Sequence, residues 1–198
     1  MYYIIAFFYI ERGGEMMKNA FVFLADGFEE IEAVTPIDIL RRAGVAVTVV
    51  AVKGNEALSA HALRVVCDAS LDDIAGKQLP DLVVLPGGGA GSKNLAASAV
   101  LQKIVRDMMA EGRLVGAICA APAVVLGSWG LLAGKKYTCF PGEGDHLADK
   151  PIDKRVVVDG NLITSKAAGS AEEFSFALVT ALCGSAGAKD IALKMFAR

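Results

Sequence analysis

The chain has 198 residues, of which 54% are hydrophobic and 21% charged, with a formal net charge of −2 at pH 7. This length predicts one domain that buries a substantial core. No basic face or charge run marks a nucleic-acid surface, so we expect no specific nucleic-acid binding. The four cysteines are scattered, with neither a Cys-x-x-Cys motif nor His/Cys metal-ligand spacing. This predicts free thiols in a reducing cytoplasm and no bound metal.

The first ten residues, MYYIIAFFYI, are apolar and aromatic but too few to span a bilayer, so we expect no membrane association. They also lack the positive region and cleavage site of a secretory signal. A purine-rich, ribosome-binding-site-like sequence could encode residues 11–15, which precede Met16 and Met17. We therefore interpret 1–17 as an extension from a mis-assigned start and 18–198 as a single domain. The alternative is a genuine segment that contacts a membrane or a dimer partner.

From residue 19 onward, short apolar runs typical of buried parallel strands alternate with stretches of helical periodicity. Glycine and Asp-Gly breaks separate them. In the first half of the chain, strands are expected at 21–25, 46–52, 81–85 and 114–118, a short edge strand at 64–67, and helices at 29–43 and 95–110. In the first helix, Ile31, Val34 and Leu40 should share one side, and Pro36 should kink or restart the helix.

The second half begins with a predicted strand at 136–140. Two strands, 155–159 and 161–165, flank Asp159-Gly160, a strong signal for a small β-hairpin. Helices are expected at 171–182 and 188–196. Alternating strands and helices joined by short loops predict an α/β fold, a parallel sheet with helices on both faces.

The chain after the strand at 114–118 carries one reactive side chain. The apolar run ends at Cys119, and a helix-compatible segment begins at once, with Pro122 in a first turn that tolerates proline. The thiol should lie near the positive end of a helix dipole, which favours the thiolate and makes Cys119 a candidate nucleophile. From this run alone, the alternative is a buried structural cysteine, since free cysteines are among the most buried residues.

Two further strand ends carry residues suited to a site. The segment Asp26–Glu32 crowds acids after one strand, and Pro86–Gly89 follows another with a backbone that can approach a ligand closely. Ligands bind beyond the carboxyl ends of parallel strands, and right-handed crossovers bring these ends to one edge. A thiol, an acid and free N–H groups at one edge therefore predict an active site. Taken singly, the glycines could be plain turns and the acids could only complement a helix dipole.

Together these segments resemble the ThiJ/PfpI superfamily, and within it the parkinsonism-associated protein deglycase branch. The resemblance covers roughly residues 18–190, and its most specific part is the Ala-Ile-Cys-Ala-x-Pro elbow with an upstream Glu-Glu-x-Glu. The matching stretches are Leu-Ala-Asp-Gly-Phe-Glu-Glu-Ile-Glu at 24–32, Arg-Arg-Ala-Gly at 41–44, Val-Val-Leu-Pro-Gly-Gly at 83–88, Ala-Ile-Cys-Ala-Ala-Pro at 117–122 and Leu-Ile-Thr-Ser at 162–165.

The resemblance implies a flavodoxin-like, class I glutamine amidotransferase-like three-layer sandwich and a homodimer without a cofactor. It implies Cys119 as nucleophile, Glu32 as a protonated partner bonded to its sulfur, and an oxyanion pocket formed by the backbone N–H groups of Gly88 and Ala120. The implied substrates are methylglyoxal and glyoxal, free or as early glycated adducts. Other members of the family are described as oxidation sensors or chaperones.

Elementary chemistry supports the implied pair. A carboxyl against a thiol, shielded from water, should not ionise together with it, so the two titrate as one unit. A thiolate beside a proton donor suits addition to an aldehyde, and N–H groups would stabilise the oxygen of the hemithioacetal. The same thiolate would be prone to oxidation by peroxide to sulfenate and sulfinate.

The chain also departs from its relatives. Ala120 replaces the histidine that follows the nucleophile in the protease-like branch, which argues against a Cys–His peptidase. Phe140 stands where animal deglycase-branch members carry a histidine. His61 lies where relatives have an arginine at a small anion site, beside Arg42, and the alternative is an ordinary surface histidine. Gly87 belongs to the glycine-rich loop, and Gly169, in a loop that reads Gly-Pro-Gly-Thr in relatives, could close the pocket from the side.

Two functions follow as hypotheses. The first is a cofactor-independent, cysteine-dependent glyoxalase or deglycase that uses Cys119 and Glu32. The second is a redox-responsive or chaperone-like protein in which oxidation of Cys119 to sulfinate changes an interaction, with little turnover. A thiamine-pathway role rests only on an inherited family name, and we discount it.

Overall fold

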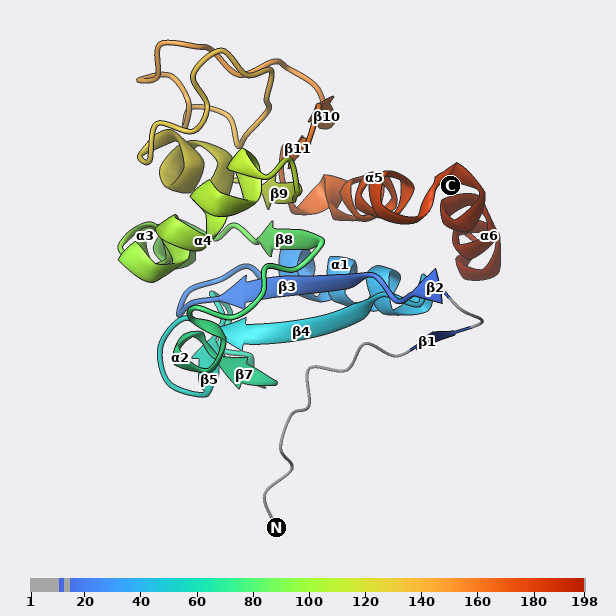
Figure 1. Cartoon of the computed structure of the whole chain (residues 1–198). Helices are drawn as coiled ribbons and strands as arrows, with labels where there is room; N and C mark the ends of the chain where they lie inside the picture. Colours follow the sequence, from blue (N-terminus) through green and yellow to red (C-terminus); the bar gives the residue numbers. More distant parts are fainter. Residues whose placement is uncertain (1–10, 13–14, 198) are drawn as a thin grey trace.

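The structure, a computed structural model, describes residues 11–12 and 15–197 (Figure 1). The expectations for residues 1–10 lie outside these described residues. The short strands β1 (Glu11–Arg12) and β2 (Glu15–Met16) pair antiparallel just before the main sheet begins. In the described part of the chain, no helix is both long and apolar enough to cross a membrane.

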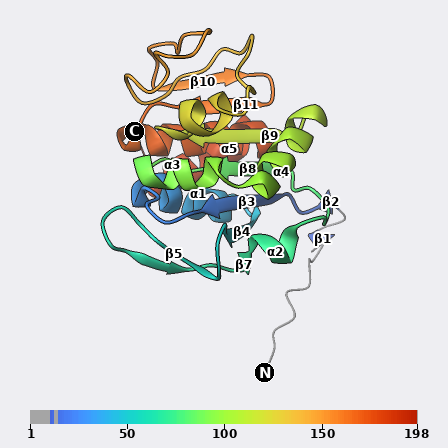
Figure 2. The ribbon, with the colours of Figure 1, turned by 90° about the vertical axis from the view of Figure 1, so that its left-hand side faces the viewer.

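The middle layer of the molecule is a mostly parallel sheet, which Figure 2 shows as a stack from β10 to β7. Within the described residues it has seven strands in the order β10-β11-β9-β8-β3-β4-β7, and only β10 is antiparallel to its neighbour. The strands are β3 (Asn19–Leu24), β4 (Ala46–Ala51), β7 (Ala69–Ser70), β8 (Leu82–Leu85), β9 (Leu114–Ile118), β10 (Val156–Asp159) and β11 (Leu162–Ser165).

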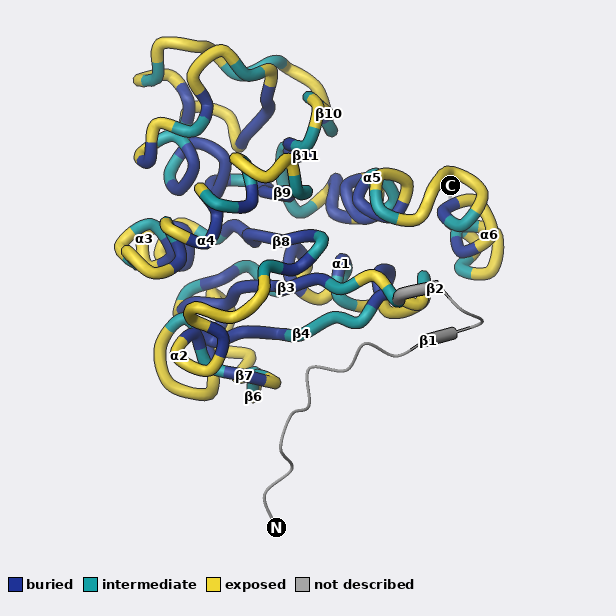
Figure 3. The backbone as a smooth tube through the Cα atoms, in the orientation of Figure 1, coloured by how far each residue is buried: buried dark blue, intermediate teal, exposed yellow. Residues whose placement is uncertain are grey.

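Helices cover both faces of this sheet, which confirms the predicted flavodoxin-like sandwich. One face carries α1 (Glu30–Arg42), α5 (Ala171–Cys183) and α6 (Ser185–Met195), and the other carries α2 (Leu71–Ile74), α3 (Gly89–Ala96), α4 (Ala99–Ala110) and the π-helical turn η1 (Pro122–Gly127). Figure 3 shows buried backbone along the strands and exposed backbone on the outer sides of these helices.

Alternation along each strand divides the core between the two faces. Phe21 and Phe23 belong to the core under α3 and α4, whereas Val22 and Leu24 belong to the core under α1 and α5. Successive side chains of a strand point to opposite faces, so a strand buried on both faces reads as a continuous apolar run. This is why the parallel strands were predictable from such runs.

Several predicted elements differ in the structure. The single helix expected at 95–110 is two helices, because the Ser98 hydroxyl accepts the Leu101 N–H at 3.2 Å and caps a new helix, α4. The strand expected at 136–140 is not part of the sheet. The expected edge strand at 64–67 is β6 (Arg64–Val66), which pairs with β5 (Glu56–Leu58) in a separate small sheet, and β7 forms the edge instead.

The first helix also differs from its prediction. It runs without interruption through the buried Pro36, from Glu30 to Arg42. Leu40 is buried as expected, but Ile31 and Val34 are 55% and 47% exposed and face away from the core. The buried side of the helix instead includes Glu32, a carboxylic acid in a position that a hydrophobic pattern does not predict.

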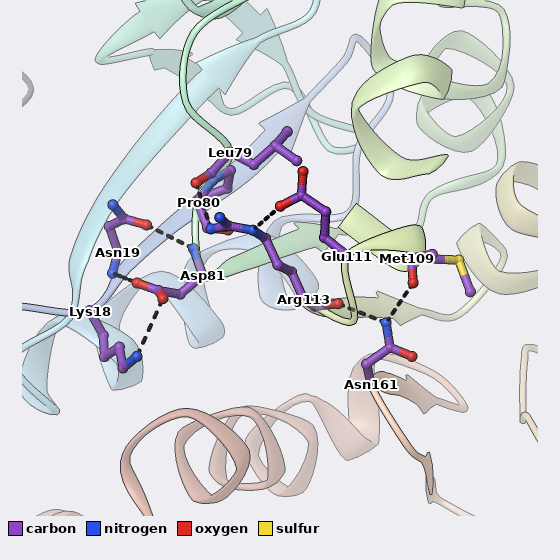
Figure 4. Close-up of polar contacts among 9 residues, drawn as sticks. All are labelled: Lys18, Asn19, Leu79, Pro80, Asp81, Met109, Glu111, Arg113 and Asn161. Atoms are coloured by element: carbon purple, nitrogen blue, oxygen red, sulfur yellow. Dashed lines mark hydrogen bonds and ion pairs between the residues drawn. The ribbon is translucent and has the colours of Figure 1, made fainter. Parts of the chain in front are cut away.

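Polar side chains join the amino-terminal ends of the central strands (Figure 4). Asp81 accepts the Asn19 N–H at 2.9 Å and pairs with Lys18 at 3.3 Å. Arg113 donates to the carbonyl oxygens of Leu79 and Pro80 at 2.9 and 3.1 Å. These bonds hold β3, β8 and β9 together at the edge opposite to the loops that carry Cys119 and Glu32.

Candidate active site

The three loops that the sequence singled out meet at the carboxyl-terminal edge of the sheet. The chain leaving β3 contacts the chain leaving β8, because the Glu29 N–H donates to the Gly87 carbonyl at 3.1 Å. The Gly87 N–H in turn donates to Glu32 Oε2 at 2.9 Å. Cys119 follows β9, the neighbour of β8. The structure thus brings the predicted thiol, acid and glycine-rich loop together.

Cys119 has a backbone conformation that is unusual for a residue with a side chain. Its φ is +63°, in the left-handed region, which costs a non-glycine residue about 1–3 kcal/mol. Both of its backbone groups are held: its N–H donates to the Ser165 carbonyl at 2.9 Å, and its carbonyl accepts the Phe140 N–H at 2.7 Å. Neighbouring elements therefore impose the bend, which turns the thiol out of the strand.

Gly87 separates the thiol from the acid and is small enough to let them approach. A Cβ atom at this position would lie 2.3 Å from Glu32 Oε2 and 2.5 Å from Cys119 Cβ, far closer than van der Waals contact. The absence of a side chain at Gly87 is thus what allows the carboxyl and the thiol to share one small space.

Glu32 is fully buried, and its environment favours the protonated form. Burial is the main cause that raises the pKa of this carboxyl from 4.5 to about 7, and the charge of Glu29 raises it further. The N–H groups of Gly87 and Ala168 and the Cys119 thiol oppose this rise by bonding to the carboxyl. Its Oε1 atom is buried without a hydrogen-bond partner of ordinary geometry among the described residues.

The Cys119 thiol does not have the lowered pKa that the sequence predicted. Burial and the adjacent Glu32 carboxylate raise its pKa to about 12, and the N–H groups of Gly88 and Ala120 only partly offset this. The expected dipole is weak because the following helical segment, η1, has only six residues in a π-helical turn. Close acids of this kind titrate as a pair with one shared charge, so the thiolate forms when Glu32 holds the proton.

The other predicted pocket residues are distributed differently. Arg42 pairs with Asp38 at 2.7 Å on the exposed side of α1, and His61 binds Glu30 at 2.9 Å. Glu30 and Arg42 are the first and last residues of a 13-residue helix, so about 18 Å of helix separates the two sites and no joint anion site forms within this chain. Gly169 is exposed, and the residue before it, Ala168, is the one that contacts Glu32.

One group in the described part of the chain has the composition of a metal site. Ligand atoms of Glu29, Glu30 and His61 lie within 4.8 Å of one another. Both oxygens of the Glu30 carboxylate are already engaged, by Ser59 Oγ at 2.6 Å and by the backbone N–H and Nδ1 of His61, each at 2.9 Å. These bonds lower the pKa of Glu30 to about 2. We interpret this group as a connection between α1 and the loop after β5.

Three residues that bond to the pair had no predicted role. Glu29 caps α1 by accepting the Glu32 N–H at 2.8 Å, Ala168 contacts the Glu32 carboxyl, and Phe140 bonds to the Cys119 carbonyl. Only Glu29 had a local signal, an acid directly before a helix. The other two reach the site through tertiary structure.

Comparison with known proteins identifies the family. Residues 18–181 match the DJ-1/PfpI family. Parkinson disease protein 7 homolog of Danio rerio is 40% identical over 182 residues, which cover 88% of this chain and 94% of that protein. The chain belongs to the DJ-1/PfpI family.

Further DJ-1/PfpI relatives show the range of the family. Protein DJ-1 homolog B of Arabidopsis thaliana is 41% identical over 177 residues, which cover 88% of this chain but only 40% of that longer protein. Glutathione-independent glyoxalase DJR-1.2 of Caenorhabditis elegans is 34% identical over 171 residues, 84% of this chain and 90% of that protein. The structure of oxidized Toxoplasma gondii DJ-1 superimposes with a TM-score of 0.87 at 35% identity and covers 91% of this chain and 98% of that one. Glyoxalase-type function is therefore present in the family.

Proposed function

We propose that this protein is a cofactor-independent glyoxalase or deglycase that converts methylglyoxal, glyoxal or their early adducts to 2-hydroxy acids. Cys119 is the nucleophile, and Glu32 carries the protons. The observation that carries the proposal is the fit of these two side chains around Gly87, which places a proton donor against a thiol. The glyoxalase name of a relative at 34% identity supports the same chemistry.

The first step is addition of sulfur to the aldehyde. The Cys119 thiolate attacks the aldehyde carbon, the C=O π bond breaks, and the oxygen takes the proton held by Glu32 to give a hemithioacetal. The N–H groups of Gly88 and Ala120 contact the sulfur, and in this mechanism they stabilise the developing negative oxygen. The pKa of Glu32 near 7 suits a group that both donates and accepts protons at neutral pH.

Proton transfer and hydrolysis complete the reaction. The Glu32 carboxylate removes the proton from the former aldehyde carbon and returns it to the neighbouring ketone carbon, and the hydroxyl proton of the hemithioacetal moves to the former ketone oxygen. The product is a 2-hydroxy thioester. Water then adds to the thioester carbonyl, the carbon–sulfur bond breaks, and the thiol and the 2-hydroxy acid are released. The sum is one dicarbonyl plus one water to one hydroxy acid, without an external oxidant or cofactor.

Substitution of the two residues tests the proposal. Cys119→Ala should abolish lactate formation from methylglyoxal, and Glu32→Ala should reduce it by at least about 100-fold, since each removes a group needed for covalent or acid–base catalysis. Circular dichroism checks that both variants are folded. Lactate production by folded Cys119→Ala at the wild-type rate would exclude the proposed mechanism.

A redox role is the second candidate. The observation that favours it is the Glu32 Oε1 atom, which has no hydrogen-bond partner of ordinary geometry in the part of the chain that the structure describes. A sulfinate on Cys119 would offer oxygen atoms that can accept a proton from this carboxyl, so oxidation would satisfy a buried polar atom. Intact-mass measurement after graded peroxide should show a selective gain of two oxygens, which Cys119→Ala should lose. Equal oxidation of Cys67, Cys139 and Cys183 would contradict this role.

We also propose a homodimer in a reducing, cytoplasmic compartment. Apolar side chains of α1 and β6, among them Ile31, Val34 and Val66, are exposed and could pack against a second copy. The four cysteines are free thiols, as a reducing compartment would keep them. Light scattering coupled to gel filtration should give twice the 20.7 kDa chain mass, and Ile31→Glu should reduce it to that of the monomer.

A further inference from the structure

Phe140 is bonded to the backbone of Cys119, one member of the Cys119–Glu32 pair. Its backbone N–H donates to the Cys119 carbonyl oxygen at 2.7 Å, so the two residues are held together. Its side chain is nevertheless 45% exposed, although phenylalanine is usually buried. A partly exposed aromatic ring on the residue bonded to the Cys119 backbone is therefore accessible to a ligand from solvent.

The residues before Phe140 indicate the side to which its ring is directed. Residues 135–139 form no sheet ladder but run without helical turns, and side chains of such an extended segment alternate between its two sides. Tyr137 and Cys139 pack into the core under α3 and α4. Thr138, between them, points the other way and donates to the Lys154 carbonyl at 2.8 Å. If this alternation continues by one residue, Phe140 follows on the Thr138 side, away from the core that Tyr137 and Cys139 enter. Cys119 packs against the other core.

The other residues that contact the Cys119 thiol and the Glu32 carboxyl have no side chain large enough to recognise a substrate's substituent. The contacts to Cys119 and Glu32 from Gly87, Gly88, Ala120 and Ala168 are all made by backbone N–H groups. Backbone N–H groups can bind an oxygen atom of the substrate. The side chains of these four residues are only a hydrogen atom or a methyl group, so they offer little contact to a substituent. Of the described residues that bond to Cys119 or Glu32, Phe140 is the aromatic one.

We propose that Phe140 determines substrate specificity. Its ring contacts the substituent on the ketone carbon of a 2-oxoaldehyde held on Cys119, so that apolar and above all aromatic substituents are preferred to hydrogen. The inference rests on the proposed function and names its substrate class: 2-oxoaldehydes with an apolar substituent. Contacts between aromatic rings of this kind correspond to a preference of roughly 3- to 10-fold.

The first test compares kcat/KM for phenylglyoxal, followed by mandelate formation, with kcat/KM for glyoxal. Phe140→Ala should lower the value for phenylglyoxal roughly 3- to 10-fold and that for glyoxal less than about 2-fold, and Phe140→Leu should lie between. Phe196→Ala is the matched control, because Phe196 is 93% exposed and directly follows α6. Figure 1 shows α6 toward the amino-terminal ends of the strands, away from the loops of the site. Equal losses with both aldehydes, or no loss, would overturn the proposal.

A second test needs no turnover and separates this proposal from the proposed function. Cys119 is alkylated with iodoacetamide and with its N-benzyl derivative, and peptide mapping assigns each rate to this thiol. The ratio of benzyl to unsubstituted rates should fall roughly 3- to 10-fold in Phe140→Ala and stay constant in Phe196→Ala. The ratio cancels any general change in thiol reactivity. An unchanged ratio overturns the role of Phe140 even if the protein turns over no aldehyde, and a reduced ratio supports it in either case.

Discussion

Replacing Gly87 by alanine is the sharpest perturbation of the site. The added Cβ would lie 2.3 Å from Glu32 Oε2, 2.5 Å from Cys119 Cβ and 2.9 Å from the Ile118 carbonyl, so at least one of these groups must move by about 1 Å. The neighbours are a buried acid and strand backbone, neither of which can yield freely. Overpacking of this kind costs about 1–3 kcal/mol, and a misplacement of about 1 Å in an active site can lower the rate about 100-fold.

The assay combines thermal unfolding with kcat/KM for methylglyoxal. Gly87→Ala should lower Tm by about 2–4 °C for each kcal/mol lost and reduce kcat/KM by about 100-fold. Gly89→Ala is the matched control, because a Cβ there meets no atom within 4 Å and Gly89 opens α3. Wild-type activity and stability in Gly87→Ala would refute the view that the close approach of thiol and carboxyl is what this site requires.

Three further predictions concern Glu32, Arg42 and Ser98. Glu32 holds its proton up to pH about 7 in the folded chain but only to about 4.5 when unfolded, so wild-type stability should fall as pH rises between these values. In urea titrations, Glu32→Gln should therefore gain stability relative to wild type over this window, by up to roughly 3 kcal/mol, and a constant difference would contradict the raised pKa. Arg42→Ala should leave kcat/KM for methylglyoxal unchanged, because the Arg42 side chain forms its ion pair with Asp38 on the exposed side of α1. A large loss of activity would show that Arg42 belongs to the active site. Ser98→Ala should cost about 1 kcal/mol of unfolding free energy by removing the cap of α4, and a neutral result would mean that the cap does not hold the two helices apart.

Local patterns were sufficient for most of the secondary structure. The strands β3, β4, β8 and β9 are recognisable because burial on both faces demands continuous apolar runs, and the β10–β11 hairpin because Asp159-Gly160 suits a tight turn. The strand expected at 136–140 failed for a tertiary reason. Its Thr138 N–H donates to the Thr164 side chain at 2.9 Å instead of to a strand partner, which no local periodicity reveals.

Some residues of the candidate site were likewise recognisable from the sequence, and others only from the tertiary structure. Cys119, Glu32 and the glycine-rich loop were identifiable because each follows an apolar strand and carries chemistry that a plain turn does not need. Within one chain, Arg42 lies at the end of α1 and His61 binds Glu30 at its start, a separation that the sequence does not reveal. Phe140 and Ala168 come from loops distant in the chain and reach the pair only in the folded protein.

The amino-acid sequence by itself determined the layered α/β architecture and the identities of the thiol and the acid, because hydrophobic periodicity and side-chain chemistry are local properties. Only the tertiary structure decided the proton distribution between Cys119 and Glu32. Burial raises both pKa values, and the Glu32 carboxylate raises that of Cys119 further, whereas the bond from the thiol lowers that of Glu32. For Cys119 these effects outweigh the short helical turn η1, for which the sequence predicted a helix dipole that favours the thiolate.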